Sequence, residues 1–239
     1  MATGSSLILV ILFTLLAGIT IGKFWERYKL RGGRWIDRRK TKQSPHYILG
    51  LNFMVSNQPD LAIEELKKAI SLDTEAIEIH MILGNLYREK GQVGRAIHMH
   101  QKLLQRPNLN TIEHAYVLLC LGLDFKRGGF LDRALEAFDE VLRLDSNNRY
   151  ALINLEKLYE EQHQWELAHN AREKAMALDN NDSHENKPIL AFLKNELGLV
   201  AQQQQNRVEA KHYFETAIEL SGQTIPAYLH LGDAQLISG

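Results

Sequence analysis

Residues 121–138 read LGLDFKRGGFLDRALEAF, and this stretch has the pattern of two short helices joined by a tight turn. The glycine pair Gly128-Gly129 is the turn signal. Before the turn, a glycine and an aromatic residue stand three positions apart, and after it an alanine and an aromatic residue stand four apart. These spacings each fall on one face of a helix. The residues are Gly122, Phe125, Ala134 and Phe138.

The same pattern recurs along the chain. A glycine opens it at Gly50, Gly84, Gly122, Gly198 and Gly232. The first two of these glycines are separated by the same interval as the last two. An alanine follows twelve positions later at Ala62, Ala96, Ala134 and Ala210. This interval, a period of about 34 residues with helical spacing inside it, is typical of tetratricopeptide repeats. We therefore predict an all-α fold, a tetratricopeptide right-handed solenoid, whose output is a surface for partners.

The period is broken twice. Four residues are inserted between Gly84 and Gly122, and eight between the fourth and fifth units. The fourth unit keeps its register but has Glu156 in place of the glycine. The last unit supplies one helix, from Ile225 onward. We predict repeats over residues 43–239, about five complete units plus the first helix of a sixth, and expect the natural protein to continue.

The N-terminal region has the composition of a membrane anchor. Residues 1–22 contain no charged side chain, and the apolar stretch within residues 4–24 supplies about 20 residues, enough to cross a bilayer as a helix. We predict one transmembrane helix over residues 1–24. The alternative is a cleaved signal peptide, which the absence of an earlier Lys or Arg and of an A-x-A type site disfavours.

A basic linker is predicted over residues 25–42. Residues 23–42 hold nine Lys and Arg against two acidic residues, a local net charge of +7. Basic residues beside a membrane helix stay on the cytoplasmic side, so we expect the N-terminus outside and the repeats in the cytoplasm. The predicted orientation signals are Lys23, Arg27, Lys29, Arg31 and Arg34. A nucleic-acid patch is the alternative, but the position beside the anchor favours contact with anionic lipid.

The first helices of such repeats line a groove, and offsets from the glycines indicate which residues face it. The predicted partner-binding residues are Tyr47, Met81, Asn85, Arg88, Tyr116, Lys126, Arg127 and Lys157, with Leu51 and Tyr150 beside them. This mixture of aromatic and basic side chains suits a peptide of some acidic character. An ordinary solvated groove without a dedicated ligand is the alternative.

No chemical site is predicted. The chain contains no phosphate-binding loop, no G-x-S-x-G and no H-E-x-x-H motif, so we expect neither catalytic residues nor an enzyme. His98 and His100 are two apart and point to different sides of a helix, which disfavours a metal site. We expect no cofactor in this chain.

Three longer phrases carry a more specific resemblance: residues 50–66 (GLNFMVSNQPDLAIEEL), residues 80–103 (HMILGNLYREKGQVGRAIHMHQKL) and residues 121–138. Together with the anchor, they resemble the lipopolysaccharide assembly protein B family. The resemblance implies a single-pass protein of the bacterial inner membrane. It also implies two protein partners, a membrane protease and a lipid A pathway enzyme, the deacetylase that the protease degrades.

One part of the family pattern is not reproduced. Family members end in a rubredoxin-like metal module with two C-x-x-C pairs, whereas this chain has one cysteine, Cys120. One cysteine cannot make a four-thiolate metal site, so we expect either that the module follows residue 239 or that the protein lacks it. The resemblance implies an adaptor that regulates lipopolysaccharide assembly. The alternative is a generic scaffold for another envelope assembly, such as pilus or secretion machinery.

Overall fold

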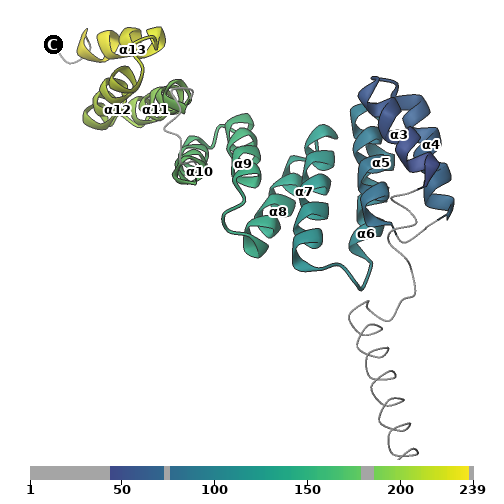
Figure 1. The fold of residues 1–239 in the computed structure, drawn as a ribbon. Coiled ribbons are helices and arrows are strands. Elements are labelled where there is room, and N and C mark those ends of the chain that lie inside the picture. The colour runs from purple at the N-terminus through teal and green to yellow at the C-terminus, as the bar shows by residue number, and fades with distance from the viewer. Residues whose placement is uncertain (1–43, 73–75, 179–185, 237–239) are drawn as a thin grey trace, which may run out of the picture. The chain divides into compact units, whose positions relative to one another are not determined.

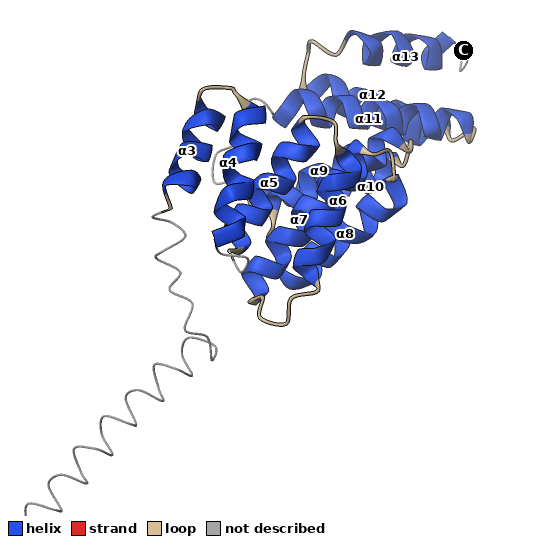
Figure 2. Cartoon of the chain, turned by 90° about the vertical axis from the view of Figure 1, so that its right-hand side faces the viewer, coloured by secondary structure: helices blue, strands red, loops and turns tan. Residues whose placement is uncertain are grey.

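A computed structural model describes residues 44–72, 76–178 and 186–236, and these residues form helices and no strands (Figure 1; Figure 2). The all-α prediction is confirmed. The helices are α3 (Pro45–Val55), α4 (Pro59–Leu72), α5 (Ile77–Glu89), α6 (Val93–Leu104), α7 (Thr111–Arg127), α8 (Leu131–Leu144), α9 (Arg149–Glu161), α10 (Trp165–Ala177), α11 (Asn186–Gln203), α12 (Arg207–Leu220) and α13 (Ile225–Leu236).

The predicted membrane anchor (residues 1–24) and basic linker (residues 25–42) lie outside the described residues. Within the described ranges, every helix is too short or too polar to cross a bilayer. The chain divides into two compact units, residues 1–79 and residues 80–239, and each is considered by itself.

Consecutive helices pair as hairpins. α3 packs on α4, α7 on α8, α9 on α10 and α11 on α12. α5 and α6 meet at Gly84, where the His100 ring lies against the glycine. An apolar core joins α7, α8, α9 and Ala171 of α10, and the fully buried Phe138 and Leu158 lie within it.

All five hairpins in the described part of the chain turn through the same hydrogen-bonded motif. Seven residues after the glycine position, the backbone has a left-handed φ between 54° and 76° at Asn57, Gly91, Gly129, His163 and Gln205. The next backbone N–H then donates to the carbonyl five residues earlier, as from Gln92 to Tyr87 at 2.8 Å. This pairing is a Schellman cap, which satisfies the last carbonyls of the first helix. The turn predicted at Gly128-Gly129 is confirmed.

The glycines are explained by close helix contact. A Cβ atom on Gly122 would lie 2.7 Å from the ring of Phe138, and one on Gly50 would lie 2.8 Å from Leu66. The covering side chain stands sixteen residues after the glycine position in every hairpin. In chain order the covering residues are Leu66, His100, Phe138, Arg172 and Phe214. In the fourth hairpin Glu156 replaces the glycine, and Arg172 Nη1 donates to its Oε2 at 3.0 Å.

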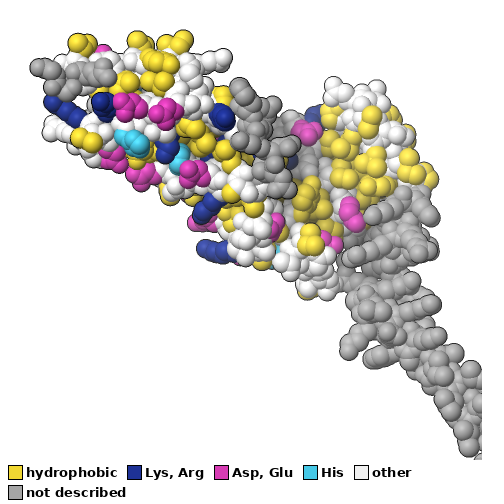
Figure 3. Space-filling view, turned by 60° about the vertical axis from the view of Figure 1, so that its left-hand side comes forward, with side chains coloured by type: hydrophobic (Ala, Val, Ile, Leu, Met, Phe, Trp, Pro, Cys, Tyr) yellow, Lys and Arg dark blue, Asp and Glu magenta, His cyan; other side chains and the backbone are white. Residues whose placement is uncertain are grey.

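α13 packs on α12 and leaves one side open. Ala227 is buried there, and Leu231 and Ala234 pack against the cores beneath α13. Four large apolar side chains remain exposed, namely Ile225, Tyr228, Leu229 and Leu236. Hydrophobic atoms accordingly gather at the upper left of Figure 3, at the C-terminal end of the chain. The glycines that open the earlier repeats each lie against a side chain of the next helix. Among the described residues, no atom covers Gly232 in this way.

The contact at Gly122 predicts a matched pair of glycine substitutions. Gly122→Ala should lower the free energy of unfolding by about 1–2 kcal/mol, because Phe138 is fully buried and cannot move aside. Gly94→Ala, in α6 with open space around it, should gain up to about 1 kcal/mol from helix propensity. Urea unfolding followed by circular dichroism measures both. Equal effects would contradict the packing account.

The shared turn predicts a stabilising substitution. Gln205 has a φ of 63°, a conformation that costs a residue with a Cβ atom on the order of 1 kcal/mol. Gln205→Gly should therefore raise the free energy of unfolding by about 0.5–1 kcal/mol, and Gln204→Gly, one residue earlier, should not. Thermal unfolding of the two variants tests this, and a gain for Gln204→Gly alone would refute it.

Candidate functional site

The residues predicted to line the groove lie on first helices of the hairpins. Tyr47 and Leu51 are on α3, in the first unit, and both are half-buried. The others lie in the second unit: Met81, Asn85 and Arg88 on α5, Tyr116, Lys126 and Arg127 on α7, and Tyr150 and Lys157 on α9. Their accessibilities differ, so they divide into an exposed set and a supporting set.

Two tyrosines form the exposed aromatic part. Tyr116 is 47% exposed and Tyr150 is 58% exposed, and they hold the same position in successive repeats. The pKa of the Tyr116 hydroxyl is raised by the neighbouring Cys120 thiol and by partial burial. Tyr150 is close enough to Tyr116 to raise the pKa of its hydroxyl, and Arg88 is close enough to lower it. The pair supplies rigid amphipathic rings suited to a partner's side chains.

A third aromatic residue stands six positions before the glycine, as Tyr116 and Tyr150 stand six before Gly122 and Glu156, but it packs elsewhere. Phe192 stands at the corresponding position of α11, but its ring lies edge-on to Trp165 with 5.9 Å between ring centroids. The aromatic pair is therefore confined to α7 and α9.

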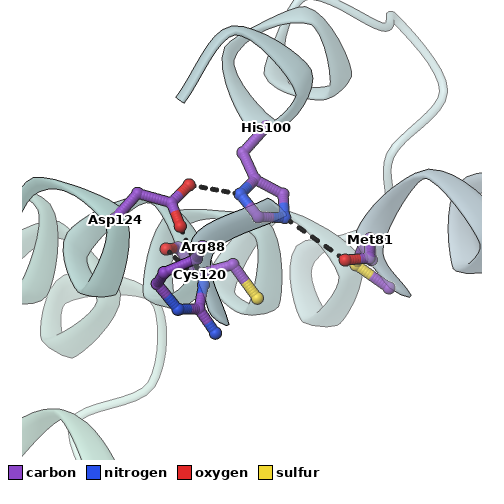
Figure 4. Close-up of polar contacts among 5 residues, drawn as sticks. All are labelled: Met81, Arg88, His100, Cys120 and Asp124. Carbon is purple, nitrogen blue, oxygen red and sulfur yellow. Dashed lines mark hydrogen bonds and ion pairs between the residues drawn. The ribbon is translucent and has the colours of Figure 1, made fainter. Parts of the chain in front are cut away.

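Arg88 is half-buried and bonded to the next repeat. Its Nη1 donates to Asp124 Oδ1 at 2.8 Å and lies 3.4 Å from the Cys120 carbonyl oxygen (Figure 4). His100 Nδ1 donates to the other oxygen of Asp124 at 2.5 Å, and both side chains are fully buried. Arg88, His100 and Asp124 form what we call the first polar cluster. Because Asp124 compensates its charge, Arg88 stabilises the packing of the repeats and offers less charge to a partner.

Cys120 is a neighbour of both Arg88 and Tyr116. Burial raises the pKa of the Cys120 thiol to about 11, and Arg88 opposes the shift. A thiol of this kind is a packed side chain and not a nucleophile. Asn85 makes a side-chain hydrogen bond to Cys120, while its Oδ1 is buried without a partner.

The basic side chains lie toward the C-terminal ends of α7 and α9. Arg127 and Lys157 are exposed. Lys126 is less accessible, with its Nζ 3.9 Å from Glu161 Oε1. Burial lowers the pKa of Lys126, and Lys157 lowers it further. Burial and the nearby Glu156 raise the pKa of Glu160. This end of the groove therefore mixes both signs of charge.

Glu156 belongs to what we call the second polar cluster. Arg172 donates from Nη1 to Glu156 and from Nη2 to Asn186 Oδ1 at 3.1 Å, and all three residues are buried. Burial raises the pKa of Glu156, whereas the charge of Arg172 lowers it. This cluster joins α9, α10 and α11.

The exposed aromatic and basic side chains of this arrangement suit binding. His100 and Asp124 have the separation of a catalytic pair, but both are fully buried and no substrate could reach them. Throughout the ranges that the structure describes, no three metal-liganding groups come together.

Sequence reasoning missed both polar clusters. A signal was present, because His100 and Arg172 occupy the covering position that is apolar in the other three hairpins. Their partners, Asp124 for His100 and Asn186 for Arg172, lie on the next helix. They could be identified only once the packing of that helix was known.

Comparison with known proteins supports the fold and the resemblance. A family model described as Tetratricopeptide repeat matches residues 193–224, the hairpin of α11 and α12. The C-terminal part of a tetratricopeptide repeat protein from Cytophaga hutchinsonii superposes with a TM-score of 0.61 at 20% identity, covering 78% of this chain and 72% of that one. That likeness shows the fold alone.

Similarity to curated relatives is more informative than the fold, because the relatives share one name. Lipopolysaccharide assembly protein B of Escherichia coli (strain K12) is 31% identical over 155 residues, which are 61% of this chain and 40% of the relative. The protein of the same name from Haemophilus influenzae (strain ATCC 51907 / DSM 11121 / KW20 / Rd) is 28% identical over 236 residues, 95% of this chain and 59% of the relative. The chain thus spans about 40–59% of their length. It has a tetratricopeptide repeat fold, and it is related to lipopolysaccharide assembly protein B, as its sequence phrases predicted.

Proposed function

We propose that this chain is an adaptor that takes part in regulating lipopolysaccharide assembly. The observation that carries the proposal is the similarity to the Haemophilus influenzae assembly protein along 95% of the chain. The repeat fold supports it, because stacked hairpins present surfaces for other proteins. The same fold and the naming of the relatives support a scaffold that is not an enzyme.

The proposed action is to bring two proteins together. Following the family resemblance, we propose that the chain links a lipid A biosynthesis enzyme, the deacetylase, to a membrane protease that degrades it. Confinement to a membrane would shorten the search for such partners, because all of them would diffuse in one plane. We propose no cofactor for the repeats.

The proposed location is the bacterial inner membrane, with one pass, the N-terminus outside and the repeats in the cytoplasm. The support is the apolar stretch within residues 4–24 and the basic linker after it. The order of these two segments follows the positive-inside rule.

The proposed contact surface is the groove on α5, α7 and α9. Tyr116 and Tyr150 would supply contact area, and Arg127 and Lys157 would supply exposed positive charge. Met81, Asn85, Arg88 and Lys126 are half-buried and would shape its floor. Such a surface suits an extended or helical peptide with acidic residues beside apolar ones.

A generic scaffold for another envelope assembly is the second candidate, since repeats of this fold serve many partners. The two candidates differ in one measurable consequence. An adaptor for degradation controls how much of the lipid A deacetylase is present, whereas a scaffold for pilus or secretion machinery does not.

Depletion of the protein in its own host tests the proposal. The deacetylase level, measured by immunoblot, should rise several-fold because its degradation slows. An unchanged level would overturn the proposed function.

Complementation then tests the groove. A variant with Arg127→Glu and Lys157→Glu should fail to restore the low deacetylase level, because it reverses the exposed charge. The control is Lys102→Glu with Lys174→Glu, which changes the same charge on the second helices α6 and α10. Full restoration by the groove variant would place the contact elsewhere.

A further inference from the structure

The side chain that covers the glycine position is polar in two of the five hairpins that the structure describes. It is apolar in the first, third and fifth hairpins, as Leu66, Phe138 and Phe214. It is polar in the second and fourth, as His100 and Arg172. These two are the hairpins that precede the broken periods, where four and eight residues are inserted before the next unit. Each apolar case precedes a unit that follows at the regular period.

The first polar cluster reaches across the first break. His100, on α6, contacts α5 through the Met81 carbonyl oxygen at 3.5 Å and α7 through Asp124 (Figure 4). Arg88 adds a second bond from α5 to Asp124. Three helices of two repeats therefore meet at one buried carboxylate. The connection between them runs from Gln105 to Asn110, whereas the regular one between α8 and α9 runs from Asp145 to Asn148.

The second polar cluster repeats this arrangement at the second break. Arg172, on α10, binds Glu156 on α9 and Asn186, the first residue of α11. Again three helices of two repeats meet at one buried side chain. The two clusters share no residue type at their centres, since one is built on a carboxylate and the other on a guanidinium. What they share is their place beside an irregular connection.

Apolar side chains show that stability alone does not require these clusters. Leu66 fills the place of His100, and Leu158, which is fully buried, fills the place of Asp124 one repeat later. Phe138 over Gly122 fills the place of Arg172 over Glu156. Replacing a buried ionic group by apolar residues of similar volume is often neutral or stabilising. A different property must distinguish the polar pairs.

That property is direction. An apolar contact tolerates sliding and rotation, whereas a hydrogen bond weakens steeply when its angle departs from linear. A connection of regular length restricts how one hairpin sits on the previous one, and a longer connection restricts it less. We propose that the two polar clusters fix the orientation of successive hairpins at the two places where the connection is too long to do so. This role does not depend on which partner the groove binds.

Spin-label distances in the full chain test the proposal. Labels on exposed residues of second helices report each junction, in a background carrying Cys120→Ala. The pair Lys102 and Asp132 spans the first break, Asp132 and Asn170 the regular junction, and Asn170 and Lys211 the second break. Each pair is measured by double electron–electron resonance, with circular dichroism as the check on folding.

Two variants replace the covering residue of each cluster and the acidic residue that it binds with a pair found elsewhere in the chain. His100→Leu with Asp124→Leu should keep the helical signal and at least double the width of the distance distribution across the first break. Glu156→Gly with Arg172→Phe should do the same across the second. The matched control is Phe138→Leu, which alters a covering residue at the regular junction and should leave its distribution unchanged.

Three results would overturn the proposal. Unchanged widths in both folded variants would mean that the clusters do not fix orientation. An equal widening in Phe138→Leu would mean that any change of core packing has this effect. Loss of helical structure in both cluster variants would mean that the clusters are needed for folding itself.

Discussion

One contact organises every hairpin of this chain, between the glycine position of the first helix and the residue sixteen positions later on the second. In the third hairpin, Gly122 lets the ring of Phe138 lie where a side chain would otherwise stand. This contact is possible at Gly122 because the glycine has no Cβ atom to meet the ring. In the fourth hairpin Glu156 stands at the glycine position, and Arg172 donates a hydrogen bond to it. The Schellman turn ends the first helix and reverses the chain, so that the second helix can pack on the first at this contact.

The exceptions to this contact are as informative as the rule. His100 and Arg172 replace apolar covering residues, and each binds the first helix of the next hairpin. The proposed contact surface is connected to these bonds, because Arg88, whose charge acts on Tyr116, donates a hydrogen bond to Asp124. Lys126 and Lys157 likewise lie close to Glu156. The surface proposed for partners is thus supported by the buried groups that join the repeats.

Much of the fold could be predicted from spacing. The glycines, the turn at Gly128-Gly129 and the register of the fourth unit, despite Glu156, all follow from positions along one helix or one turn. The turns at His163 and Gln205 could not be found in this way, because neither residue favours a left-handed φ. Their conformation is imposed by the hairpin that closes around them. The candidate site shows a similar division. Offsets selected Tyr116 and Tyr150, which are exposed, but the ion pair of Arg88 with Asp124 could not be predicted from offsets.

Local periodicity is a property of the sequence, and the sequence alone determined the helical hairpins, their common period and the two places where it breaks. The phrases at residues 50–66, 80–103 and 121–138 also sufficed to indicate the relatives. Contacts between helices of different repeats are not periodic in this sense. Only the tertiary structure showed that Asp124 joins His100 to Arg88, that Asn186 completes the cluster around Arg172, and that Phe192 packs on Trp165. The reason is geometric, since the rotation of one hairpin on the next decides which side chains meet, and no spacing within a single helix encodes that rotation.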